Sequence, residues 1–360
     1  MAAIKTVRLF YLQTFESEML RTFCMALFAL GLSASALGGS VNIVRMGTGP
    51  IIHAGLDPSI GENIQGPSLV RVPDWVQNPL GKYYLYFADH KGAYIRLAYA
   101  DDLLGPWQVY VPGSLQLGDT PFLCSPPKVS AEERARLEEN FKARGVKISH
   151  DIIAEVTAPH IASPDVHVDE ANQRFVMYYH GLEGVGQQVT RVAVSEDGVH
   201  FRSMQEVLGQ TYWRSFVWKN HHYALAMPGQ FYRSKHPFTG YEKGPKLFNP
   251  NMRHNAVLIR EGVLYVFWTQ VGDVPEHIKL STIELSGDWM SWKEVGGNEV
   301  LRPEYAWEGS QAPLEPSVRS TAYGVLNQLR DPAIFVDEGM VYLLYAVGGE
   351  AGVALARVEF

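Results

Sequence analysis

Two histidines twenty residues apart, His160 and His180, have the type and spacing that acid–base chemistry requires. Imidazole is the side chain that gains and loses a proton near neutral pH. His160 stands just before a short alternating stretch, Asp165 to Asp169, and His180 ends a longer stretch that begins at Arg174. Both stretches have the pattern of strands, and a polar turn separates them. If they pair as a hairpin, the two imidazoles meet at one end of it, as a site or as a hydrogen-bonded structural pair.

The strand pattern that positions this pair recurs along the chain. Five units each contain a short strand followed by longer ones, and four of the units end with a fourth strand. The innermost strands are expected to begin near Gly66, Ser163, Trp213, Arg253 and Arg330. Four meandering antiparallel strands in about 45 residues are typical of one blade of a β-propeller.

The fifth unit lacks a fourth strand, whereas the strand-like segment 42–52 precedes the first unit without a partner. Adding this segment to the last blade removes two exposed sheet edges at once. We therefore predict an all-β fold, a five-bladed β-propeller whose last blade is closed by the N-terminal strand. The propeller is expected to form a single domain over residues 42–360, with insertions at 112–154 and 296–328.

The first insertion is predicted to contain one helix with a charged, solvated surface. Ser130 is its expected N-cap, Glu133 completes a capping box, and Gly145 lies just beyond its end. This helix is assigned no chemistry.

Residues 1–36 have the pattern of an export signal. Arg21 precedes the apolar run 23–32, and the small residues 34–36 offer a cleavage site. The apolar run is too short to span a bilayer, so no membrane span is expected. Because the stretch before Met19 is long for a signal, the chain starts at either Met1 or Met19. The mature protein is predicted to be periplasmic or secreted.

Composition limits the partners. The net charge is −7 and the pI about 6.0, without a basic run, so nucleic acid is not an expected partner. Removal of the signal would leave Cys124 without a disulfide partner. A monomer is expected.

Polar residues gather where the innermost strands of a propeller begin and the second strands end. Such convergence on a rigid scaffold favours a binding site. Asp165 and Asp331 have an alternative role, since a carboxylate at a blade mouth can cap backbone N–H groups. The expected substrate-binding residues are Asp165, His90, Trp213, His222, Arg233, Arg253, His254 and Asp331.

The repeated blade mouths, with S-P-D-V in blade two and R-D-P in blade five, resemble the carbohydrate-active propellers of glycoside hydrolase family 43. That resemblance implies a five-bladed fold and hydrolysis by three carboxylates from blades one, two and three. Asp165 matches in blade two. Blade one has Gly66-Pro67-Ser68 and blade three has Trp213-Arg214-Ser215, so paired-carboxylate hydrolysis lacks at least one partner.

The His160 and His180 spacing is similar to that of polysaccharide lyases of the ulvan lyase and rhamnose–glucuronate lyase kind. This second resemblance concerns the site, since those propellers have more blades. It implies catalytic roles for His160, His180 and Tyr223, with Arg233 nearby, in β-elimination from a uronate. Elimination needs a proton acceptor, a proton donor and a cation beside the substrate carboxylate. No metal is required, although Ca²⁺ could occupy the central channel.

The sequence therefore predicts an enzyme that cleaves uronate-containing oligo- or polysaccharides by β-elimination. A propeller glycoside hydrolase is the first alternative, and a non-catalytic sugar-binding propeller is the second. Several titratable groups at one mouth favour catalysis, because a site that only binds sugar needs fewer of them.

Overall fold

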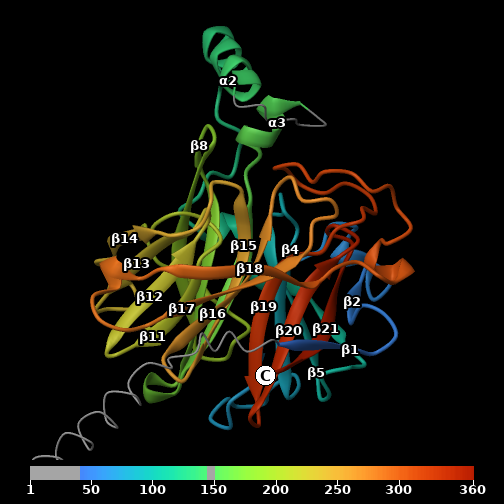
Figure 1. Ribbon diagram of the computed structural model, residues 1–360, viewed down its shortest axis with the longest axis vertical. Coiled ribbons are helices and arrows are strands. Elements are labelled where there is room, and N and C mark those ends of the chain that lie inside the picture. The colour runs from blue at the N-terminus through green and yellow to red at the C-terminus, as the bar shows by residue number, and fades with distance from the viewer. Residues whose placement is uncertain (1–40, 144–150) are drawn as a thin grey trace, which may run out of the picture. The chain divides into compact units, whose positions relative to one another are not determined.

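The computed structural model describes residues 41–143 and 151–360, and its strands form five antiparallel sheets (Figure 1). The predicted export signal and Gly145 lie outside the described residues. Blade one contains β3 (Gln65–Arg71), β4 (Tyr83–Ala88), β5 (Tyr94–Ala100) and β6 (Gln108–Gln116). Blade two contains β7 (Ile161–Asp169), β8 (Arg174–Gly184), β9 (Gln187–Ser195) and β10 (Arg202–Ser203). Blade three contains β11 (Arg214–Trp218), β12 (His221–Ala226), β13 (Gln230–Ser234) and β14 (Glu242–Lys246). Blade four contains β15 (Met252–Arg260), β16 (Val263–Gln270), β17 (Ile278–Glu284) and β18 (Glu294–Leu301).

The fifth blade joins the two ends of the propeller. Its strands are β19 (Arg330–Asp337), β20 (Met340–Val347) and β21 (Gly352–Glu359), and the outermost position is taken by β1 (Asn42–Met46). β1 pairs antiparallel with β21, with Asn42 opposite Glu359. The five-bladed propeller closed by the N-terminal strand is therefore confirmed. The predicted continuous segment is divided, because a left-handed turn at Gly47 separates β1 from β2 (Ile52–His53), which also pairs with β21.

The core consists of five apolar clusters, one between each pair of neighbouring blades. Aromatic side chains supply much of it. Tyr86 of blade one meets Phe201 of blade two edge to face, and Trp213 of blade three stacks on Tyr178 of blade two. Each aromatic ring buries a large area, so the packing between blades supplies most of the stabilisation of the ring.

The innermost strands share a distortion at the point where they begin. The pairing register shifts in β3, β7, β15 and β19. At the same level Gly66, Ser163, Tyr212 and Asp331 have left-handed φ values of 46–62°. Only glycine fits at the first of these positions, because a Cβ on Gly66 would lie 2.8 Å from Ser163 Cα. These bulges turn the blade mouths toward the axis.

The same level of the ring is tied together by polar contacts between blades. Ser68 Oγ accepts a hydrogen bond from Val166 N at 2.8 Å. The buried Arg214 guanidinium donates to the carbonyl oxygens of Asn255, Pro164 and Pro67, which belong to three other blades. Arg214 thus connects four of the five innermost strands.

Two outer strands of the blades differ from the sequence expectation. The fourth strand of unit four was expected at Met290 to Glu294, but Trp289–Ser291 forms a 3₁₀ turn and the strand is β18. The prediction was wrong because Trp289 and Trp292 are buried between blades three and four, which moves the strand downstream. β6 also extends into the first predicted insertion, as far as Gln116.

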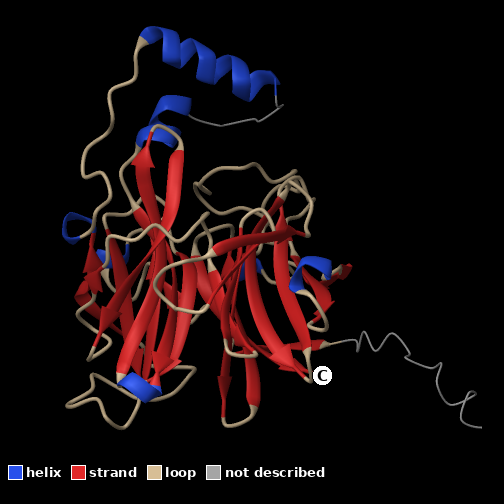
Figure 2. Cartoon of the chain, turned by 90° about the vertical axis from the view of Figure 1, so that its left-hand side faces the viewer, coloured by secondary structure: helices blue, strands red, loops and turns tan. Residues whose placement is uncertain are grey.

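The first insertion contains two helices where one was expected: α2 (Ala131–Ala143) and α3 (Ile152–Thr157), which lie near the tip of β8 (Figure 2). The N-cap prediction is confirmed, since Ser130 Oγ accepts a hydrogen bond from Glu133 N at 3.1 Å. The short α3 has its own cap, Asp151, which accepts from Ile153 N at 2.8 Å. Within the described ranges, no helix has the length and apolar character needed to cross a membrane.

Candidate functional site

A pocket of about 460 Å³ opens at the end of the propeller where the innermost strands begin. His90 of blade one, Tyr212 at the start of blade three and Arg253 of blade four line it. Gln188 of blade two and Glu155 of α3 contribute to its walls. Residues from four blades thus meet at this pocket, which makes it a candidate for a substrate site.

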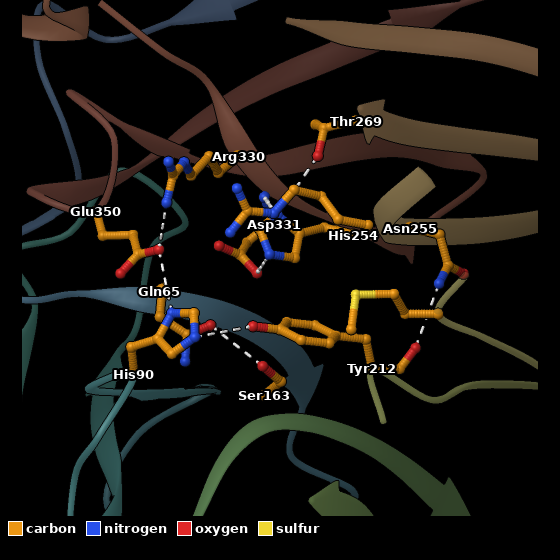
Figure 3. Close-up of polar contacts among 12 residues, drawn as sticks. Gln65, His90, Ser163, Tyr212, His254, Asn255, Thr269, Arg330, Asp331 and Glu350 are labelled. Carbon is orange, nitrogen blue, oxygen red and sulfur yellow. Dashed lines mark hydrogen bonds and ion pairs between the residues drawn. The ribbon is translucent and has the colours of Figure 1, made fainter. Parts of the chain in front are cut away.

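Three of the residues at or beside this pocket form a relay. Glu350, in the turn between β20 and β21, contacts His90 Nδ1 through Oε1 at 3.2 Å. The other ring nitrogen, His90 Nε2, lies 3.4 Å from the Tyr212 hydroxyl. A carboxylate thus orients an imidazole, and the imidazole faces a hydroxyl group at the pocket (Figure 3). This order of groups is the arrangement that activates a nucleophile.

The pKa values of Glu350 and Tyr212, the two ends of the relay, are shifted in opposite directions. Burial alone would raise the pKa of Glu350, but His90 and Arg330 outweigh it and hold the pKa below the ordinary value. Arg330 Nη1 lies 2.7 Å from Glu350 Oε1, and Asn63 Nδ2 donates to Oε2 at 2.7 Å. At the other end, burial raises the pKa of Tyr212 well above its ordinary value. The carboxylate is therefore ionised and the phenol protonated at neutral pH.

His160 and His180 lie close together, and His180 is next to Tyr212 of the relay. Their ring centroids lie 5.9 Å apart, and His180 pairs with Ala162 in the blade-two hairpin. The ring of His180 is 4.8 Å from the ring of Tyr212. His160 Nδ1 donates to the carbonyl of Ala158 at 2.7 Å, which fixes its tautomer.

Burial keeps both histidines neutral. It lowers the pKa of His160 to about 3 and the pKa of His180 well below its ordinary value. Both nitrogens of His180 and Nε2 of His160 are buried without a hydrogen-bond partner. Buried polar atoms of this kind need a partner, which either water or a bound ligand would supply.

A second pair, His254 and Asp331, lies on the other side of Tyr212. The rings of His254 and Tyr212 are 4.7 Å apart, and His254 Nε2 lies 3.4 Å from Asp331 Oδ1. Asp331 N donates to His254 Nδ1 at 3.2 Å, so the ring proton is on Nε2 and faces the carboxyl group. Burial, with the negative charge of Glu350, raises the pKa of Asp331 to about 8. Asp331 is therefore a neutral acid at pH 7, unlike Glu350.

Two arginines and two glutamates lie buried around these groups. Arg253 Nη1 and Arg330 Nε lie 3.3 and 3.4 Å from Glu276 Oε2, and Arg330 also pairs with Glu350. Arg253 and Arg330 lower the pKa of Asp331, but burial and the negative charge of Glu350 outweigh them.

The structure places several predicted site residues away from the pocket, and Asp165 is one of them. Its carboxylate lines a separate pocket of about 320 Å³ toward the opposite end of the central channel. It accepts from Ser215 N and from His167 Nε2, both at 2.8 Å. Asp165 thus has the alternative role, that of capping a backbone N–H group.

Blade three also departs from the expected arrangement. Trp213 is buried between blades two and three, against Tyr178 and Tyr232. Tyr223 lies in the apolar cluster between blades three and four, stacked on Phe216. Alternation along β12 directs the Tyr223 ring into a blade interface instead of toward the axis.

Two further residues of blade three lie on its outer strands or rim. Arg233 pairs with Glu242 at 2.6 Å and covers the ring of Trp289. His222 lines a third pocket with Asp169 and Arg174, between blades two and three. Of the predicted site residues, the structure gathers His90, His160, His180, Arg253, His254 and Asp331 at the axis.

Sequence reasoning missed Tyr212, Glu350 and Glu276. Tyr212 immediately precedes the predicted mouth residue Trp213, and it is the residue of this mouth with a left-handed backbone. Glu350 stands in the G-G-E-A-G turn after β20, the second strand of blade five. Polar residues were expected at the ends of the second strands, so this rule could have indicated Glu350. Among the described residues, no group of three or more His, Cys, Asp or Glu side chains is arranged to hold a metal ion.

The sequence has a relative of almost the same length. It is 32% identical over 351 residues to "Uncharacterized protein R118" of Acanthamoeba polyphaga mimivirus, an alignment that covers 89% of this chain and 91% of the viral protein. The chain belongs to the family of this viral protein. No family model matches the sequence.

The fold of this family member is similar to that of solved sugar-active proteins. An N-acetylgalactosamine deacetylase from F. plautii aligns with a TM-score of 0.51 at 10% identity, covering 88% of this chain and 95% of that one. CoXyl43, a GH43 β-xylosidase/α-arabinofuranosidase from a compost microbial metagenome, aligns with a TM-score of 0.51 at 11% identity over 88% and 94%. The exo-β-1,3-galactanase of Phanerochaete chrysosporium has a TM-score of 0.50 at 12% identity over 88% and 64%. At these identities the likeness shows the five-bladed fold.

Proposed function

We propose that this protein is a carbohydrate-active enzyme that hydrolyses a glycosidic bond at the axial pocket. The observation that carries the proposal is the Glu350–His90–Tyr212 relay beside the pocket. The sugar substrates named for the similarly folded xylosidase, galactanase and deacetylase support the substrate class. Hydrolysis is preferred to the β-elimination expected from the sequence, because two of these three proteins are named as glycosidases.

The relay supplies a nucleophile and a proton carrier. As the Tyr212 oxygen attacks the anomeric carbon, His90 Nε2 accepts the phenolic proton, and Glu350 stabilises the imidazolium that forms. The glycosidic oxygen departs from the opposite face of the sugar and takes up a proton from solvent, while His90 keeps the phenolic proton. In the second step water attacks from that opposite face and releases a proton to solvent, and His90 returns its proton to Tyr212 as the glycosyl–tyrosine bond breaks. The anomeric configuration is retained after two displacements.

The surrounding charges fit this chemistry. Arg253 lines the pocket beside Tyr212, and its guanidinium group is buried. The neutral His180 and His254 flank the tyrosine ring, so neither ring places a positive charge beside it. A tyrosine serves as the nucleophile of sialidases, so the residue type is suited to the role.

A panel of activated aryl glycosides tests the proposal, with galactosides, xylosides, arabinofuranosides and N-acetylgalactosaminides as the first members. We expect hydrolysis of at least one, and loss of about 10²–10⁴-fold in kcat in His90→Asn. His200→Asn is the matched control, because His200 is an exposed histidine that pairs with Asp197. Absence of turnover across the panel, with a folded protein, would contradict the proposal.

β-Elimination is the second candidate, and the neutral His160 and His180 favour it, since a neutral imidazole can remove a proton next to a uronate. Incubation with uronate oligosaccharides separates the two reactions, because elimination alone gives an unsaturated, ultraviolet-absorbing product. Binding without turnover would identify a sugar-binding propeller.

Export through residues 1–36 and a monomeric state remain predictions, which N-terminal sequencing of the secreted protein and light scattering would test.

A further inference from the structure

The helical insertion has an apolar pair that the propeller fold does not explain. In α2, every residue is exposed except Leu137 and Phe141, which are half-buried. Residues four apart lie on the same face of a helix. Most of the other side chains of α2 are charged or polar, so Leu137 and Phe141 mark the one face of the helix that has something to contact.

That face is directed at the candidate site. Phe141 lines the same pocket as His90 and Tyr212. Glu155 and Val156 of α3 line it as well. The insertion therefore supplies an aromatic ring and a carboxylate to a pocket whose floor comes from the blades.

The insertion is anchored next to the relay. Lys91, the neighbour of His90, donates through Nζ to the carbonyl of Glu155 at 3.1 Å and lies 3.3 Å from its Oε1. Gly186 N, in the β8–β9 turn, donates to the carbonyl of Val156 at 2.8 Å. α2 is joined to α3 by the pair Arg134–Asp151 at 3.1 Å. These contacts place Phe141 at the pocket without burying it in the core.

We propose that Phe141 is the platform of a second sugar position, adjacent to the one at Tyr212. A pyranose ring presents an apolar C–H face and a polar rim, and an exposed aromatic ring beside polar groups matches both. The inference rests on the proposed function and specifies it: the substrate is an oligosaccharide, with one sugar at Tyr212 and the next against Phe141.

Kinetics on two substrates of different length test the proposal. A glycosyl fluoride occupies only the position at Tyr212, whereas a trisaccharide of the sugar identified by the aryl-glycoside panel occupies both. Phe141→Ala is expected to raise KM for the trisaccharide about threefold to tenfold, with kcat unchanged. For the fluoride, KM is expected to stay at the wild-type value. Phe141→Trp should retain the wild-type KM on both substrates, and Glu139→Ala, at an exposed position of the same helix, is the matched control.

Equal effects of Phe141→Ala on the two substrates, or no effect on either, would overturn the proposal. Calorimetric binding of the trisaccharide to Tyr212→Phe separates this inference from the proposed chemistry. If Tyr212→Phe retains full activity, but the added Phe141→Ala change weakens binding of the trisaccharide and not of the monosaccharide, the relay is wrong and the platform stands. If Tyr212→Phe is inactive and the added change leaves trisaccharide binding intact, the platform is wrong and the relay stands.

Discussion

Neighbouring charges decide which of the two buried carboxyl groups on the axis is ionised. Glu350 is ionised because Arg330 and His90 contact it, whereas Asp331, a few ångströms from the His254 ring, keeps its proton. The two carboxyl groups have opposite protonation states at pH 7, although each is almost completely buried. Pairs of titratable groups whose environments separate their pKa values are typical of catalytic sites.

The raised pKa of Asp331 has a consequence for stability. Between its unfolded pKa near 4 and its folded pKa of about 8, the native state binds one proton more than the unfolded state, so stability falls as pH rises through this range. The buried histidines contribute in the opposite direction, because the unfolded state still binds part of their protons at pH 7, and Asp331→Asn leaves that contribution unchanged. We expect Asp331→Asn to remove the loss of stability between pH 7 and 8. Denaturant unfolding of both proteins at these two pH values measures it, and parallel pH dependence would contradict the assignment.

The buried histidines predict a loss of stability in acid. Their folded pKa values are lowered, so the unfolded state takes up protons first as pH falls below about 6.5, and the stability present above that pH is lost. His180→Phe removes one such group, and His180 makes no hydrogen bond that the change would break. The difference in Tm between pH 7 and pH 5 should be smaller in His180→Phe than in the wild type. An equal difference would indicate that His180 is charged in the folded protein.

Single residues were the least predictable part of the site. His160, His180, His254 and Asp331 could be selected because histidine and blade-mouth position are visible in the sequence. Tyr212 and Glu350 could not, since nothing in a sequence distinguishes one tyrosine among eighteen until the chain bends at its left-handed φ. Trp213 and Tyr223 failed for the opposite reason: they have suitable types but point into the interfaces between blades.

Among the elements, β1 is held by more than its strand pairing. Arg45 of β1 donates through Nε to Glu308 Oε1 at 2.8 Å, and Glu308 is completely buried in the second insertion. Glu308 also accepts from the backbone N–H groups of Glu304 and Tyr305 and from the Tyr345 hydroxyl. A buried carboxylate ties the N-terminal strand to the insertion and to blade five.

Removal of one partner of the Arg45–Glu308 ion pair should lower the stability of the protein. Arg45→Ala leaves Glu308 buried without its cation, and we expect a loss of about 2–4 kcal/mol in the free energy of unfolding. Arg202→Ala is the matched control, because Arg202 pairs with Glu196 on the surface and should cost no more than about 1 kcal/mol. Urea unfolding compares the two, and similar small losses would show that Glu308 does not depend on Arg45.

At the scale of the whole molecule, the repeat carried most of the information. Alternating strands and their turns predicted five blades and the closing strand, because period-2 patterning reports which face of a strand is buried. The two insertions could be located as gaps in the strand repeat, but most of their short elements could not be predicted. α3 is six residues long, β2 two residues and the 3₁₀ turn at Trp289 three, and tertiary contacts decide elements of that length.

Closure makes the ring depend on its first strand. Deletion of residues 1–46 removes β1 and the Arg45–Glu308 contact, and it exposes the outer edge of β21. We expect this variant to lose the cooperative thermal transition of the wild type, or to undergo it at a much lower temperature. Deletion of residues 1–40 alone is the control and should melt like the wild type. A wild-type melting curve for the longer deletion would contradict the closure.

The central claim is that the Tyr212 oxygen attacks the sugar. The most direct measurement is the mass of the intact protein after incubation with a 2-deoxy-2-fluoro glycoside of the sugar that the aryl-glycoside panel identifies, followed by peptide mapping. The fluorine slows both displacements, and an activated leaving group such as dinitrophenolate keeps the first faster than the second, so the glycosyl–enzyme accumulates. We predict one added fluoroglycosyl group, attached to Tyr212, and no addition in Tyr212→Phe. An adduct on another residue, or hydrolysis by Tyr212→Phe at the wild-type rate, would contradict the account.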